Sequence, residues 1–170
     1  MLKQLIAKLD LKKIDLRRVL LYFLYLFLTL VLQNMVLTHI RPLGVCPFVL
    51  PAAAVAVGMF EGGTWGAVFG LVLGIFTDMV YVESTVTYTL LFPALAFATG
   101  FVSQFFINRR FFGFMLAAAV GLLITALVQM IKIWAADSGS LSMVGTAILQ
   151  TLWSLPPAAL AYFPPARWIE

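Results

Sequence analysis

Long runs of apolar residues, separated by short polar turns, constrain this chain more than any other feature. A helix that crosses a hydrocarbon core of about 30 Å needs about 20 mostly apolar residues. Six such runs can be drawn, at approximately 19–38, 44–60, 62–79, 88–107, 112–134 and 143–163. Backbone groups in lipid must be satisfied internally, and runs of this length do not alternate as the strands of a barrel do. The sequence therefore predicts an all-α membrane protein, a bundle of six transmembrane helices.

The composition agrees with a single membrane domain. Of the 170 residues, 63% are hydrophobic and 11% are charged, whereas soluble domains are about 45–50% apolar and about 25% charged. We expect a basic amphipathic segment at 1–18, a six-span domain at 19–163 and a short tail at 164–170. The first apolar run is too long for a signal-peptide core and lacks a small-residue cleavage pattern, so we expect it to be retained.

The basic residues are unevenly placed. Six of the eleven lie in the first 18 residues: Lys3, Lys8, Lys12, Lys13, Arg17 and Arg18. Apolar residues at helical spacing among them predict a segment lying on the bilayer, its cations facing anionic headgroups. If the N-terminus is inside, only Arg41 and Lys132 fall in outer segments, so the positive-inside rule predicts both termini in the cytoplasm. We expect a multi-pass protein of the bacterial cytoplasmic (inner) membrane, with lipid rather than nucleic acid as its surroundings.

Glycines recur every fourth residue along the third run. Gly62, Gly66, Gly70 and Gly74 follow this spacing, and Asp78 takes the next place. Residues four apart share one face of a helix, so these glycines remove side chains from a continuous strip. Another backbone can approach closely there, and such packing holds membrane bundles together. Two interpretations stay open: the strip packs a helix of the same chain, or it contributes to a site for a partner or ligand.

Three further polar residues are candidates for contacts between helices. Asp78 is either an exposed acid at a helix end or a buried carboxylate with a donor from another span, because an unpaired acid in lipid is costly. Candidate donors are His39, Arg41 and Lys132. Gln33 and Asn34 lie in the outer half of the first run, where amides can hydrogen-bond across helices.

The sequence contains no recognisable catalytic or metal-binding motif. It has one histidine and one cysteine, which excludes multi-histidine zinc motifs and an internal disulfide. The glycine spacing is GxxxG rather than that of a nucleotide-binding loop. We therefore expect a protein that is not an enzyme and that carries no metal and no cofactor.

One family resemblance rests on residues already described. The stretch PFVLPAAAVAVGMFEGGTWGAVFGLVLGIFTD, from Pro47 to Asp78, resembles the bacterial rod-shape-determining protein MreD family, as does Leu32-Gln33-Asn34. The resemblance implies a non-enzymatic subunit of the cell-elongation machinery. Such a subunit binds the bitopic membrane protein MreC, and through it connects MreB filaments to peptidoglycan synthases.

The same family is similar in fold to the substrate-binding subunits of energy-coupling-factor transporters, which supplies an alternative. On this interpretation the chain is a small-molecule (vitamin) binding subunit, with an outward pocket where Gln33, Asp78, Tyr81 and Trp134 could converge. Those subunits typically carry small residues at Ala-x-x-x-Ala spacing on their first span. Here that span reads LLYFLYLFLTLVLQN, which is bulky throughout and weighs against the alternative.

Overall fold

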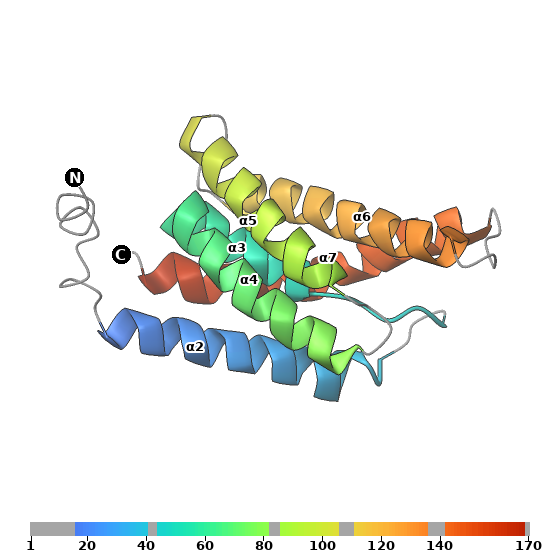
Figure 1. Ribbon diagram of the computed structural model, residues 1–170, viewed down its shortest axis with the longest axis horizontal. Helices are drawn as coiled ribbons and strands as arrows, with labels where there is room; N and C mark the ends of the chain where they lie inside the picture. Colours follow the sequence, from blue (N-terminus) through green and yellow to red (C-terminus); the bar gives the residue numbers. More distant parts are fainter. Residues whose placement is uncertain (1–15, 41–43, 82–85, 106–110, 136–141, 169–170) are drawn as a thin grey trace.

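The structure is a computed structural model that describes residues 16–40, 44–81, 86–105, 111–135 and 142–168. Within these residues the regular secondary structure is all helical (Figure 1). The elements are α2 (Leu16–Val31), which continues into the π-helix η2 (Leu32–Leu37), α3 (Leu50–Glu61), α4 (Gly63–Val80), α5 (Thr87–Phe105), α6 (Phe111–Ala135) and α7 (Ser142–Trp168). These helical segments correspond one to one with the six predicted apolar runs. Three of them are long and apolar enough to cross a membrane: Arg17–Leu37, Gly63–Val80 and Phe111–Lys132.

Helix α3 forms the centre of the bundle. Every residue from Leu50 to Phe60 is buried, and α4, α5, α6 and α7 all pack against this helix. Alanine and valine predominate in it, so neighbouring helices come close on all sides. Its 12 residues extend about 18 Å, well short of a hydrocarbon core. Residues 45–49, which lead into α3, are non-helical and are here called the entry segment. The last three residues of this segment are buried.

The second run is therefore only partly helical. The predicted span begins at residue 44, but the helix begins at Leu50. Pro47 disfavours a helical conformation at the residue before it. Pro51 falls in the first turn of α3, where its missing N–H would have had no helical partner. These two prolines explain why the entry segment stays non-helical and the helix begins after it.

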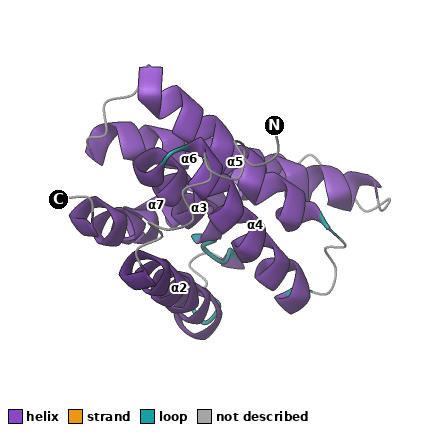
Figure 2. Cartoon of the chain, turned by 60° about the vertical axis from the view of Figure 1, so that its left-hand side comes forward, coloured by secondary structure: helices purple, strands orange, loops and turns teal. Residues whose placement is uncertain are grey.

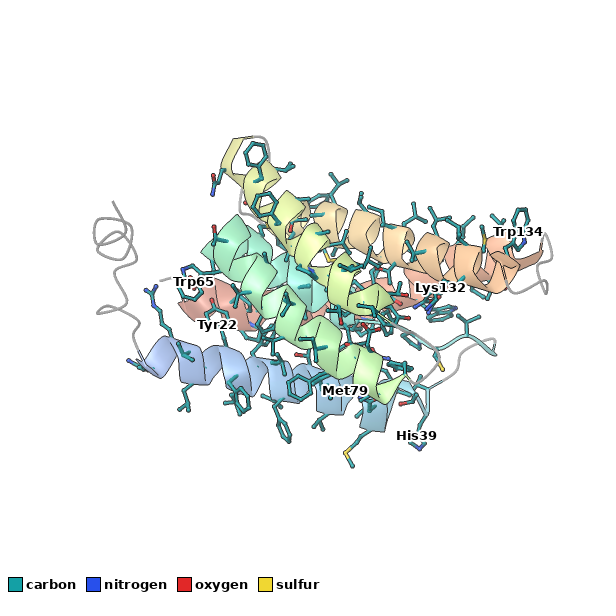
Figure 3. The ribbon with its side chains drawn as sticks, in the orientation of Figure 1. Tyr22, His39, Trp65, Met79, Lys132 and Trp134 are labelled. Carbon is teal, nitrogen blue, oxygen red and sulfur yellow. The ribbon has the colours of Figure 1, made fainter. Side chains whose placement is uncertain are left out.

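The bundle has two ends, here called the Glu61 end and the Asp78 end. Figure 3 shows Tyr22 and Trp65 towards the first, with His39, Met79, Lys132 and Trp134 towards the second. Successive helices run back and forth between them (Figure 1). Helix α7 continues to Trp168, so the first residues of the predicted tail at 164–170 are helical.

Helix α2 lies at the edge of the bundle (Figure 2). Its outward side chains include Phe23 and Phe27, which are exposed, whereas Tyr25 and Leu26 are buried against the other helices. The Tyr25 ring stacks on Phe69 of α4, with 5.8 Å between ring centroids. Few side chains thus attach α2 to the other helices, so each polar contact that it makes contributes substantially to holding it in place.

Candidate functional site

Three of the four predicted strip residues pack against helices of the same chain. A Cβ on Gly70 would come within 2.7 Å of the Phe92 carbonyl oxygen, and one on Gly74 would come within 2.5 Å of the Tyr88 carbonyl oxygen. A Cβ on Gly66 would clash with the backbone of Gly58 in α3. These three residues are called the glycine strip below. It is filled by the backbones of α5 and α3, so a partner's helix could not lie there without displacing them.

Gly62 has a different role from the other three. Its φ of +93° is a conformation that L side chains rarely adopt, and it connects the end of α3 to the start of α4. A Cβ on Gly62 would meet only the Gln104 side chain, at 3.7 Å. The prediction from the four-residue spacing therefore wrongly includes Gly62 in the strip, because the chain reverses direction at this residue.

Two glycines outside the ladder contribute to the same packing. Added Cβ atoms on Gly58 of α3 and Gly100 of α5 would clash with the backbones of Ala96 and Gly63, respectively. Close backbone approach thus involves α3, α4 and α5 together. Gly58 lies four residues before Gly62 and so continues the four-residue spacing into α3, whereas Gly100 belongs to no repeating spacing.

Asp78 binds the first turn of α5. Its carboxylate accepts hydrogen bonds from the Thr89 backbone N–H (2.8 Å), the Thr89 hydroxyl (2.6 Å) and the Tyr88 backbone N–H (3.2 Å). The first N–H groups of a helix have no partner within it, and the helix dipole favours a negative charge there. Asp78 is thus a half-buried carboxylate with donors from another helix, and the donors named here are residues of α5 rather than the predicted candidates. Of those, Arg41 lies outside the described residues.

Gln33 supports the entry segment from η2. The side chain is 1% exposed; its Nε2 donates to the Pro47 carbonyl at 3.0 Å, and its Oε1 accepts from the Val49 N–H at 2.9 Å. One side-chain amide thereby satisfies two backbone groups of the entry segment, which have no helical hydrogen-bond partners. Asn34 instead donates to the Leu30 carbonyl within its own helix. Gln33 thus bonds to a non-helical segment rather than across two helices, and the Asn34 bond lies within its own helix.

Helix α7 supplies two more supports to the entry segment, which sequence reasoning missed. The Phe48 N–H donates to the Ser154 hydroxyl at 2.8 Å, and the Gln150 amide donates to the Cys46 carbonyl at 3.4 Å. Non-helical backbone is tolerated at membrane depth only where protein or water satisfies it. Because the partners are backbone atoms, nothing in the spacing of side chains marks this contact in advance.

Aromatic rings fill the space between the entry segment and the Asp78 end. Phe48 lies 5.5 Å from Tyr88, 6.1 Å from Tyr81 and 6.4 Å from Phe92, measured between ring centroids. The Gln129 amide of α6 donates to the Tyr88 hydroxyl at 2.6 Å. Burial raises the pKa of the Tyr81 phenol, while a hydrogen bond with Gln33 partly opposes that shift.

A small cavity adjoins this cluster between α6 and α7. Its volume is about 10 Å³, room for about one water molecule. Five of its eight lining residues are polar, but the atoms that face the cavity are largely apolar. The lining consists of Phe48, Leu122, Thr125, Ala126, Gln129, Gln150, Thr151 and Ser154. Of the four residues proposed for an outward ligand pocket, Gln33 and Tyr81 do meet, but Trp134 is 55% exposed near the far end of α6 (Figure 3).

The Glu61 end carries the described part of the basic segment. Arg17 and Arg18 are exposed at the start of α2, while Lys3, Lys8, Lys12 and Lys13 lie outside the described residues. The Tyr22 hydroxyl donates to the Glu61 carboxylate at 2.5 Å, joining α2 to the end of α3. Glu61 therefore has an internal partner in α2.

No family model matches the sequence, no curated protein matches it, and no solved structure matches the chain.

Proposed function

We propose that this chain is a non-catalytic subunit of the bacterial cell-elongation (rod) machinery, with six spans in the cytoplasmic membrane and both termini inside. In this proposal it binds a bitopic protein resembling MreC, and through it helps connect MreB filaments to peptidoglycan synthases. The proposal joins the resemblance over Leu32–Asp78 to what those residues do in the fold.

The observation that carries the proposal is that the residues of the resemblance form one connected structure. Gln33 holds the entry segment, which leads into the central helix α3. The glycine strip brings α4 against α3 and α5, and Asp78 binds the start of α5. Their hydrogen-bonding groups and close-packed surfaces are used within the chain. Such a motif is suited to building a rigid scaffold, whose outer helices are then left for a partner.

The alternative, a vitamin-binding transport subunit, draws on the small cavity between α6 and α7. Pockets for small molecules usually have volumes of about 300–1,000 Å³, and this cavity has about 10 Å³. The Phe48 ring and the entry segment occupy the neighbouring space. A vitamin would need that segment to move, so the scaffold proposal requires fewer changes to the structure.

Depletion of the protein in a rod-shaped host tests the proposal. We expect depleted cells to lose rod shape, and a single-span protein to copurify with the wild-type chain in mild detergent. Normal cell shape after depletion would contradict the proposal. A vitamin retained through purification of the wild-type protein would favour the alternative.

A further inference from the structure

Prolines in this chain free backbone carbonyls from their helical partners. In an α-helix the carbonyl of residue i accepts from the N–H of residue i+4, and a tightened turn can use residue i+3 instead. Proline has no N–H. Helix α7 contains two adjacent proline pairs, Pro156-Pro157 and Pro164-Pro165. Each pair removes both donors from one carbonyl, that of Trp153 and that of Ala161, respectively.

The Ala161 carbonyl has a replacement donor. The Tyr25 hydroxyl of α2 donates to it at 2.9 Å, in a buried contact. A carbonyl outside any helix is satisfied in a similar way before α3, where Gln33 donates to the Pro47 carbonyl at 3.0 Å. Both donors come from the first helical segment. A carbonyl freed by proline is thus satisfied here by a side chain from another helix.

The Trp153 carbonyl differs in where it faces. A helical carbonyl points along the axis towards the next turn, here towards Pro156, which is exposed, and Pro157, which is half-buried. Large apolar side chains on the same side are also exposed: Leu152 (62%), Trp153 (38%) and Leu160 (59%). Among the residues that the structure describes, no donor from outside α7 reaches this carbonyl.

We propose that this face of α7 docks one membrane helix of a partner protein, and that a hydroxyl side chain on that helix donates to the Trp153 carbonyl. The Tyr25–Ala161 contact is the internal example of the same recognition. Lipid tails offer no donor, so an unsatisfied carbonyl at membrane depth favours a helix that can supply one. The inference rests on the proposed function in one respect, that α7 spans the membrane, and it names where a bitopic partner would bind.

A defined membrane peptide tests the inference without a native partner. The probe is a polyleucine peptide of about 24 residues, flanked by lysines, with one central tyrosine and a dansyl group; its matched control carries phenylalanine instead. Energy transfer from the four tryptophans of the protein to the dansyl group reports association in phosphatidylethanolamine–phosphatidylglycerol vesicles. We expect about threefold tighter association of the tyrosine peptide, the size typical of one hydrogen bond between membrane helices.

Proline variants show whether the Trp153 carbonyl is responsible. Pro157→Ala restores the i+4 donor inside α7, so the preference for tyrosine should disappear, and Pro156→Ala should reduce it through the i+3 donor. Pro165→Ala alters the other pair and should leave the preference unchanged. Equal binding of the two peptides to the wild-type protein, or a preference that survives Pro157→Ala, would overturn the inference. If the preference behaves as expected but depletion leaves cell shape normal, the proposed function fails and this inference stands.

Discussion

The hydroxyl of Tyr25 donates a hydrogen bond to the Ala161 carbonyl at 2.9 Å, which joins the peripheral helix α2 to the last turns of α7. The two residues are 136 positions apart in the chain. The contact exists because Pro164 and Pro165 leave Ala161 without a helical donor. The contribution of the Tyr25 hydroxyl to stability should therefore depend on the proline pair, and this coupling can be measured.

Tyr25→Phe should weaken the attachment of α2, because it leaves a carbonyl unsatisfied inside the bundle. We expect a loss of about 1 kcal/mol in the free energy of unfolding, measured by denaturation in mixed micelles. In a Pro165→Ala background residue 165 can donate to Ala161, so the same substitution should cost clearly less. Equal losses in the two backgrounds would show that the hydroxyl and the proline pair are not coupled.

Alanine in the glycine strip should destabilise the fold by overfilling the contact with α5. At Gly70 and Gly74 the new Cβ would lie within 2.7 and 2.5 Å of a backbone oxygen, and we expect each variant to lose about 1–3 kcal/mol. Gly70→Leu should be worse still. The matched control is Gly145→Ala in α7, where nothing lies within 4 Å of the added Cβ. Thermal unfolding in detergent should separate the strip variants from this control; similar melting temperatures for all three alanine variants would contradict the packing described here.

Loss of the Asp78 carboxylate should loosen the first turn of α5. Asp78→Ala removes the acceptor of the Tyr88 and Thr89 N–H groups, and we expect a cost of about 0.5–2 kcal/mol, as for other residues that cap helices. Asp78→Asn keeps one acceptor oxygen and should lose less. Hydrogen exchange checks this locally: the amides of residues 88 and 89 should exchange faster in Asp78→Ala. Unchanged exchange at both would count against the capping role.

Some of these features are visible in the sequence and others are not. The length of the apolar runs identifies the helical segments, because backbone N–H and C=O groups in lipid must form their hydrogen bonds within each segment. The four-residue glycine spacing includes Gly58 and the strip, but it does not show that Gly58 lies in a different helix, and it misses Gly100, whose role depends on the placement of α4 beside α5. Asp78 is recognisable as an unusual acid, whereas its donors are backbone groups that no residue pattern marks. The same holds for Ser154, which is an ordinary helical serine until Phe48 lies beside it.

Gln33→Leu should release the entry segment from η2. The substitution removes the donor to the Pro47 carbonyl and the acceptor of the Val49 N–H, and it leaves two backbone groups without partners in a buried place. Cys46, the single cysteine of the chain, lies in this segment and is half-buried. We expect its reaction with a maleimide reagent to be at least about tenfold faster in Gln33→Leu, since about 1.4 kcal/mol of lost restraint corresponds to a tenfold change in the exposed population.

Ser154→Ala, which removes one contact from the α7 side, should give a smaller increase. Ser103→Ala is the matched control, because that hydroxyl binds the Met59 carbonyl at the opposite end of α3, and its labelling rate should equal that of the wild type. If Gln33→Leu also labels at the wild-type rate, the entry segment is held by its apolar packing around Phe48 rather than by the amide.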